Sequence, residues 1–192
     1  MTAVTALPPP AVQRSRPFTR ADLETMPDDG RRHELIDGTL VVTPSPGLRH
    51  QDVVLELAVL LRSAAPAGCH VVLAPFDVVV GDDTVLQPDV LVARRSDLTD
   101  KNLPAAPLLA VEVLSPATRM FDRNMKRATF ERAGTPAFWV VDPLVPSLTA
   151  WELRDGAYVQ PAEVSGDQAF AATVPFPVTV VPSELVSAER PR

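Results

Sequence analysis

Apolar residues recur along this chain in one helical pattern and in several short runs. At residues 48–62 they fall at the spacing of one helix face, through Val54, Leu57, Ala58 and Leu61. The short runs have the length of strands and lie at residues 71–74, 76–80, 85–93, 108–114 and 137–141. We expect 71–80 and 85–93 to belong to one sheet and 108–114 to be a strand buried on both faces.

Turn and cap signals set the limits of these elements. The Asp-Gly dipeptides at residues 37–38 and 155–156 each stand between apolar runs and predict two-residue hairpin turns. Thr19 predicts the start of a short helix, and a longer helix is expected to follow Ser115-Pro116 and to end at Ala133. Helices, hairpins and strands in this order predict an α/β or α+β domain with a mixed central sheet.

Length and composition fit one domain with two tails. The chain has 192 residues, of which 46% are hydrophobic, enough for a core. Residues 1–17 hold four of the 21 prolines without periodicity, so we expect a flexible tail there, a domain at 18–182 and a C-terminal tail at 183–192. No apolar run reaches the ~18 residues that span a bilayer, and the N-terminus lacks a signal-peptide pattern, so a cytoplasmic protein without membrane contact is expected. The single cysteine, Cys69, excludes an internal disulfide and a cysteine-rich zinc site.

The net charge of −6 means that a nucleic-acid partner would need a local basic patch. Residues 119–132 offer such a patch, with five basic side chains against two acidic ones. The basic residues are Arg119, Arg123, Lys126, Arg127 and Arg132. A solvated helix face would give the same run of charge, and this alternative stays open.

Two carboxylates stand in apolar strands, where an ionised side chain is costly unless a cation or several donors compensate it. Asp89 follows a proline near the start of one strand, and Glu112 lies in the middle of the next. If these strands are neighbours, both side chains can point into one site, where they would repel each other without a cation. Two hard oxygen donors without a cysteine cluster favour Mg²⁺ or Mn²⁺ over zinc.

The helix expected after Glu112 brings a cation to this pair. Asp122, Lys126 and Phe130 are spaced by four and therefore share one helix face. Beside two carboxylates, the Lys126 ammonium could orient or deprotonate a water, or stabilise charge on a phosphate. An ordinary surface ion pair between Asp122 and Lys126 is the alternative.

Four motifs in this order resemble the Uma-type family of bacterial restriction-endonuclease-like proteins, which belongs to the PD-(D/E)XK nuclease superfamily. The motifs are QPDVLVA at 87–93, VEVLSPAT at 111–118, D-x-x-x-K at 122–126 and FWVVDP at 138–143. The resemblance covers roughly residues 18–182. It implies a restriction-endonuclease-like mixed central sheet flanked by helices, with extra β-hairpins.

The resemblance also implies roles for single residues. Asp89 matches the acid of the PD element and Glu112 the second acid. The superfamily's lysine normally follows two residues later, where Leu114 stands, whereas in the Uma-type family the following helix supplies it, which points to Lys126. The implied protein is an endonuclease that cleaves nucleic acid, expected to be DNA, with Mg²⁺ or Mn²⁺ held by both acids and the Val113 carbonyl.

By the same likeness Glu34 and His50 lie near the site, where they and Asp122 are possible accessory residues. Glu34 would be either a third residue of the metal shell or an exposed hairpin carboxylate, and His50 would either bind phosphate or be a surface histidine. Phosphates flanking the cut are expected to contact Arg119, Arg123 and Arg127. Phe130 departs from the family, in which a tyrosine is usual, and so lacks a hydroxyl near Lys126.

Two expectations concern partners. A homodimer is predicted, because Val174, Phe176, Val178 and Val180 alternate on one apolar face near the C-terminus. The rival to a nuclease is a catalytically weak or inactive module that keeps the nuclease fold and binds nucleic acid or a protein. The retained acids and Lys126 oppose this rival, and Phe130 and the acidic net charge favour it.

Overall fold

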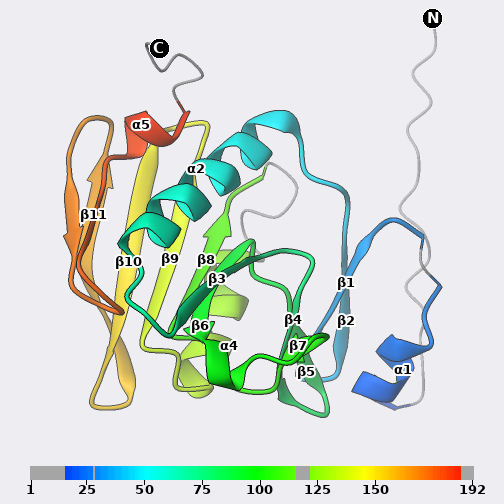
Figure 1. Ribbon diagram of the computed structural model, residues 1–192. Coiled ribbons are helices and arrows are strands. Elements are labelled where there is room, and N and C mark those ends of the chain that lie inside the picture. Colours follow the sequence, from blue (N-terminus) through cyan, green and yellow to red (C-terminus); the bar gives the residue numbers. More distant parts are fainter. Residues whose placement is uncertain (1–15, 28, 116–121, 187–192) are drawn as a thin grey trace, which may run out of the picture.

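The computed structural model describes residues 16–27, 29–115 and 122–186, with only the backbone of residues 122 and 123. Its largest sheet has six strands in the order β11-β10-β9-β8-β6-β3 (Figure 1). These strands are β3 (Cys69–Leu73), β6 (Val90–Arg94), β8 (Leu109–Val113), β9 (Ala137–Asp142), β10 (Ser147–Arg154) and β11 (Ala157–Ser165). Only β8 and β9 run parallel, so the sheet is mixed, as predicted.

Two smaller sheets complete the strands. The first has the order β2-β1-β5-β4-β7, and the second pairs β12 with β13. Their members are β1 (Arg32–Ile36), β2 (Thr39–Thr43), β4 (Asp77–Gly81), β5 (Thr84–Leu86), β7 (Asn102–Leu103), β12 (Phe170–Ala172) and β13 (Val178–Val180). Both predicted hairpins are confirmed as β1–β2 and β10–β11. At the first turn Asp37 and Gly38 have φ of 49° and 74°, the positive values that a tight hairpin of this kind requires.

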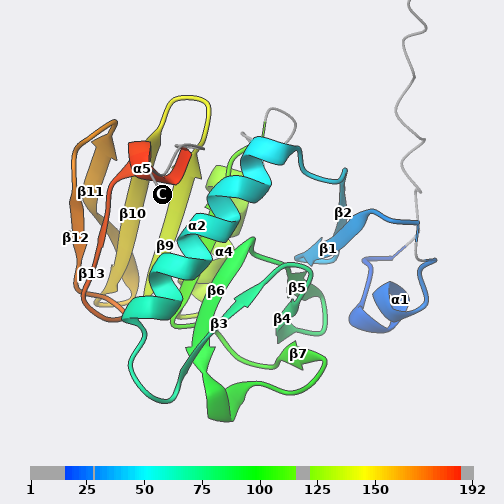
Figure 2. The ribbon, with the colours of Figure 1, turned by 45° about the horizontal axis from the view of Figure 1, so that its top comes forward.

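The helices lie on both sides of the large sheet. α2 (Leu48–Ala64) crosses one face, next to α5 (Pro182–Val186), and α4 (Arg127–Arg132) packs on the other (Figure 2). A π-helical turn, Asp122–Lys126, leads into α4, and a 3-10 turn spans Arg95–Asp97. α1 (Arg20–Glu24) begins at a capping box made by Thr19 and Asp22, as expected.

The alternation of β8 divides the core in two. Leu109, Val111 and Val113 pack toward α2, whereas Ala110 packs with Phe130 of α4 on the opposite face. All five residues of β8 are buried, which confirms the expected strand with two covered faces. The same alternation turns Glu112 toward the α4 side of the sheet.

The expectation that residues 71–80 and 85–93 form strands of one sheet is wrong. β3 and β6 pair in the large sheet, whereas β4 and β5 pair in the five-stranded sheet. The chain leaves one sheet for the other at Gln87-Pro88-Asp89, because Pro88 has no N–H to continue a ladder. β7 lies in the connection between β6 and β8.

The apolar face near the C-terminus is covered within the chain itself. Phe176, Val178 and Val180 belong to the core between α2 and the large sheet, with exposures of 5%, 8% and 0%. This face therefore gives no support to a dimer, and the homodimer stays a prediction. Leu185 of α5 joins the same core, so ordered structure extends into the segment expected as a tail. Across the described ranges, no helix is long and apolar enough to cross a membrane.

Candidate functional site

The two predicted acids meet at one end of the β6–β8 ladder. Val90 of β6 is in register with Val111 of β8, so Asp89, one residue before β6, stands opposite Glu112. Residues opposite each other in an antiparallel pair have neighbouring side chains. The prediction that these strands are neighbours is confirmed, and it brings both carboxylates to one place.

Glu112 shares the ammonium of Lys126 with Glu34. Lys126 Nζ lies 3.1 and 3.0 Å from the two carboxylate oxygens of Glu112 and 3.0 Å from Glu34 Oε1. All three side chains are fully buried, at 0% exposure. Glu34 comes from β1, where its Oε1 also accepts a hydrogen bond of 2.7 Å from the Gln87 N–H. The switch between sheets at residue 87 frees this N–H from the strand ladder.

Lys126 is the last residue of the π-helical turn, and Phe130 follows it by one α-helical turn. Both side chains are 0% exposed, so the helix face predicted from their spacing is a buried one. The surface ion pair offered as an alternative is therefore wrong for Lys126. Phe130 packs against Phe138, with ring centroids 5.6 Å apart.

Asp89 forms a second, more open cluster. Its Oδ1 accepts a hydrogen bond of 2.8 Å from Arg32 Nη1, and its Oδ2 lies 2.8 Å from the Val113 N–H and 3.1 Å from His50 Nε2. Burial by itself would raise the pKa of Asp89. The hydrogen bond from His50 and the positive charges of Arg32 and Lys126 outweigh it, and the pKa falls from 3.8 to about 2.

Arg32 links the two clusters and is not among the site residues predicted from the sequence. Besides Asp89, its guanidinium contacts the hydroxyl of Thr43 at 3.1 Å and the carbonyl of Gln87 at 3.2 Å. Its Nε lies 3.7 Å from Glu34 Oε2. Arg32 and Glu34 are two residues apart in β1 and so lie on the same face of the strand. That spacing in the sequence RRHEL was the signal that could have revealed Arg32.

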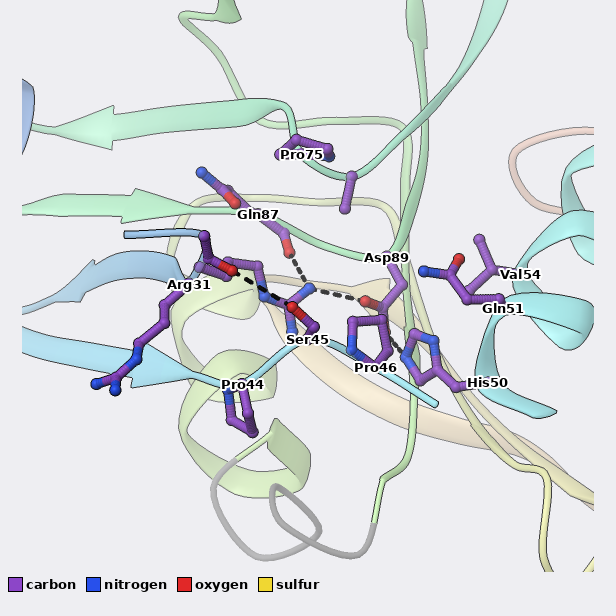
Figure 3. Close-up of a pocket in the computed structure, with 13 residues that line it drawn as sticks. Arg31, Pro44, Ser45, Pro46, His50, Gln51, Val54, Pro75, Gln87 and Asp89 are labelled. Atoms are coloured by element: carbon purple, nitrogen blue, oxygen red, sulfur yellow. Dashed lines mark hydrogen bonds and ion pairs between the residues drawn. The ribbon is translucent and has the colours of Figure 1, made fainter. Parts of the chain in front are cut away.

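A pocket of about 380 Å³ opens over Asp89 (Figure 3). It lies between the first turn of α2, the segment after β2 and the turn between β3 and β4. Its lining residues are Gly30, Arg31, Arg32, Pro44, Ser45, Pro46, His50, Gln51, Val54, Ala74, Pro75, Gln87 and Asp89. Glu34, Glu112 and Lys126 are not among them, so the pocket reaches the Asp89 cluster and the other cluster is sealed beneath it.

The other predicted residues fall into three groups. Glu34 and His50 join the site, the first fully buried and the second 9% exposed, so neither is a surface residue. The Arg127 guanidinium lies over the Trp151 ring, 5.3 Å from its centroid. Arg119 and the side chains of Asp122 and Arg123 lie outside the described residues.

The donor set of this site fits a magnesium-like cation in chemistry. Asp89, Glu112 and Glu34 offer hard carboxylate oxygens, and Glu34 Oε2 is buried without a hydrogen-bond partner in the described part of the chain. The carboxylates are, however, paired with Arg32 and Lys126. Within residues 16–27, 29–115 and 122–186, no group of three or more His, Cys, Asp or Glu side chains is placed so that it could hold a metal ion in its present arrangement.

The low pKa of Asp89 predicts that the free energy of unfolding falls at acidic pH. Because ionised Asp89 is favoured in the fold, its contribution is complete above about pH 4 and is lost as the pH falls toward 2. Over this window the wild type should lose on the order of 2 kcal/mol more unfolding free energy than Asp89→Asn. Urea unfolding at several pH values measures both curves, and the exposed Asp100→Asn should follow the wild type. Parallel curves for Asp89→Asn and the wild type would contradict the prediction.

Comparisons with known proteins agree with this architecture. The model of the family Uma2, described as "Putative restriction endonuclease", matches residues 20–181. A crystal structure from Anabaena variabilis, described as a putative nuclease belonging to DUF820, superposes with a TM-score of 0.69 at 19% identity. The match covers 89% of this chain and 98% of that one, and it shows that the two share a fold. No curated protein matches the chain. Because the family model spans most of the sequence, this chain belongs to the Uma2 family of putative restriction endonucleases.

Proposed function

We propose that this protein is a metal-dependent endonuclease that hydrolyses phosphodiester bonds of nucleic acid, with DNA as its substrate. The observation that carries the proposal is the meeting of Asp89, Glu112 and Lys126 in one site of a chain from a restriction-endonuclease-like family. Apolar residues would fill this part of the core at a lower cost in free energy than buried carboxylates and a buried lysine. Their retention therefore favours a chemical role.

Asp89 and Glu112 would hold Mg²⁺ or Mn²⁺, together with the carbonyl of Val113, whose N–H already binds Asp89. A bound cation of this kind supplies charge neutralisation at the scissile phosphate and an activated water. His50 orients Asp89 through the 3.1 Å contact to Oδ2. Glu34, two residues after the pocket residue Arg32 in β1, holds the Lys126 ammonium together with Glu112.

Lys126 would position the attacking water or stabilise the charge that develops on the phosphate. Its ammonium is held in place by two carboxylates, so it does not have to reorganise during the reaction. Arg119, Arg123 and Arg127 would contact phosphates on either side of the cut. Arg127 would reach them from its place over Trp151.

A second function is favoured by one observation: Glu112 and Lys126 are fully buried, and only Asp89 of the three lines the pocket. A module that keeps the nuclease fold and binds nucleic acid or a protein partner without cutting would tolerate such a closed arrangement. It would not require divalent cations for binding.

A cleavage panel separates the two functions. We expect the protein to nick or cut supercoiled, linear or single-stranded DNA when Mg²⁺ or Mn²⁺ is present, and to lose this activity in EDTA. RNA of matched sequence tests the choice of substrate. A gel shift of nucleic acid without cleavage of any substrate in Mg²⁺ or Mn²⁺ would favour the binding module. It would contradict the endonuclease proposal.

A further inference from the structure

The guanidinium of Arg32 occupies the space among the three carboxylates of the site. It is bonded to Asp89 at 2.8 Å and lies 3.7 Å from Glu34. Burial by itself would lower the pKa of Arg32, but the charges of Asp89, Glu112 and Glu34 together raise it. All three carboxylates therefore act on this one cation.

The balance of charge limits what else the site can hold. Among the described side chains of the site, three carboxylates face two cations, Arg32 and Lys126, so their formal charges sum to −1 with a neutral His50. A divalent cation added to this set would reverse the balance to one positive charge in a largely buried place. The same cation in exchange for Arg32 would leave the site neutral, the arrangement that costs least where water is excluded.

We propose that Arg32 is the resident counter-cation of this site and that a divalent metal binds by displacing its guanidinium from Asp89. The inference rests on the proposed function, because it presupposes that Asp89 and Glu112 bind a metal. Arg32 then sets the metal concentration at which the nuclease becomes active, as a positioning residue that acts through Asp89.

The two cations of the site differ in their freedom to leave. The Lys126 side chain is 0% exposed, whereas that of Arg32 is 20% exposed and lines the pocket above Asp89. Arg32 can therefore turn outward from β1 into this pocket while Lys126 stays in place. Apart from Asp89, Arg32 is held inward by hydrogen bonds to the Thr43 hydroxyl and the Gln87 carbonyl and by the 3.7 Å ion pair with Glu34.

Titration calorimetry with MnCl₂ on the full-length protein tests this exchange. Arg32→Gln should bind Mn²⁺ at least about tenfold more tightly than the wild type, because no positive charge has to leave the site. Its metal-free form should melt at a lower temperature than the wild type, and Mn²⁺ should raise that temperature by a larger amount. Arg94→Gln is the control, since Arg94 is an exposed arginine outside the pocket and pairs with Asp97 at 3.8 Å. It should keep the wild-type affinity.

Thr43→Val provides a second variant that retains every charge. It removes one hydrogen bond that holds Arg32 inward and should tighten Mn²⁺ binding by about threefold to tenfold. This variant tests the proposal even if Arg32→Gln fails to fold.

The outcomes separate this inference from the proposed function. If Asp89→Asn loses Mn²⁺ binding but Arg32→Gln and Thr43→Val bind no more tightly than the wild type, the metal site stands and the role of Arg32 is wrong. If neither the wild type nor Arg32→Gln binds Mn²⁺, or if Asp89→Asn binds it like the wild type, both the metal site and the counter-cation role are overturned.

Discussion

Lys126→Met is expected to lower the free energy of unfolding by about 3–5 kcal/mol. Methionine keeps most of the volume of the lysine stem, so packing changes little. It removes the ammonium that lies 3.0 Å from both Glu34 and Glu112, and leaves two fully buried carboxylates facing each other. A buried carboxylate that loses its cation costs several kcal/mol, and here one ammonium serves two carboxylates.

Urea unfolding at pH 7 measures this loss, and Lys101→Met is its control. Lys101 is the other lysine of the chain and is exposed, so its replacement should change stability by less than about 0.5 kcal/mol. The triple variant Glu34→Gln, Lys126→Met and Glu112→Gln should recover most of the loss, because it removes the charges together. A loss below about 1 kcal/mol for Lys126→Met would show that solvent reaches the carboxylates.

The contribution of Lys126 to stability limits the use of Lys126 variants as probes of cleavage. The sequence alone suggested two acids that repel each other until a cation arrives. In the structure Lys126 and Arg32 already stand between them, so the metal-free site is held together by attraction. A cleavage defect in a Lys126 variant would therefore mix lost stability with lost chemistry, and the carboxylates are the better probes of the reaction.

Short sequence signals predicted the elements whose conformation depends on a few neighbouring residues. The Asp-Gly dipeptides identified both hairpins because positive φ at two successive positions is demanding and few residues accept it. The place of Asp89 opposite Glu112 followed from the tendency of sequential strands to be neighbours. That tendency, with the family motifs, was enough to predict that the two acids share one site.

The sequence could not reveal what covers an apolar face. The alternation of Phe176, Val178 and Val180 is the same whether the face meets a second copy or the chain's own core, and the structure shows the core. The depth of Lys126 was hidden for a related reason. Its spacing from Phe130 gave a shared helix face but not the side of the helix that the sheet buries, so a surface ion pair stayed possible until the fold was known.

Glu112→Gln should reduce cleavage at saturating substrate by at least about 10²–10³-fold, the second large effect expected in this site. The amide keeps the shape of the side chain but removes the charge that the proposed metal site requires. Lys126 keeps its contact with Glu34, so the fold should survive the change. Mn²⁺ affinity should fall in parallel, which calorimetry measures without any substrate.

Glu34→Gln is the matched comparison, because Glu34 and Glu112 contact the same Lys126 ammonium at similar distances and are equally buried. The two variants should lose similar stability. If Glu112 holds the metal and Glu34 holds only Lys126, Glu34→Gln should keep Mn²⁺ affinity within a few-fold of the wild type and should cleave better than Glu112→Gln. Equal losses of affinity would instead make Glu34 a third ligand, in keeping with its buried Oε2, which accepts no hydrogen bond from the described residues.

Residues that act as one unit do not contribute additively, so the double variant Asp89→Asn with Glu112→Gln should cleave little worse than either single variant. Independent roles would instead multiply the two defects. The pattern that would end the nuclease hypothesis is specific: Asp89→Asn and Glu112→Gln proteins that are folded, bind Mn²⁺ like the wild type and show the same cleavage. In that case the buried carboxylates and their two cations would be a structural network, and the nucleic-acid-binding or protein-binding module would be the better account of this fold.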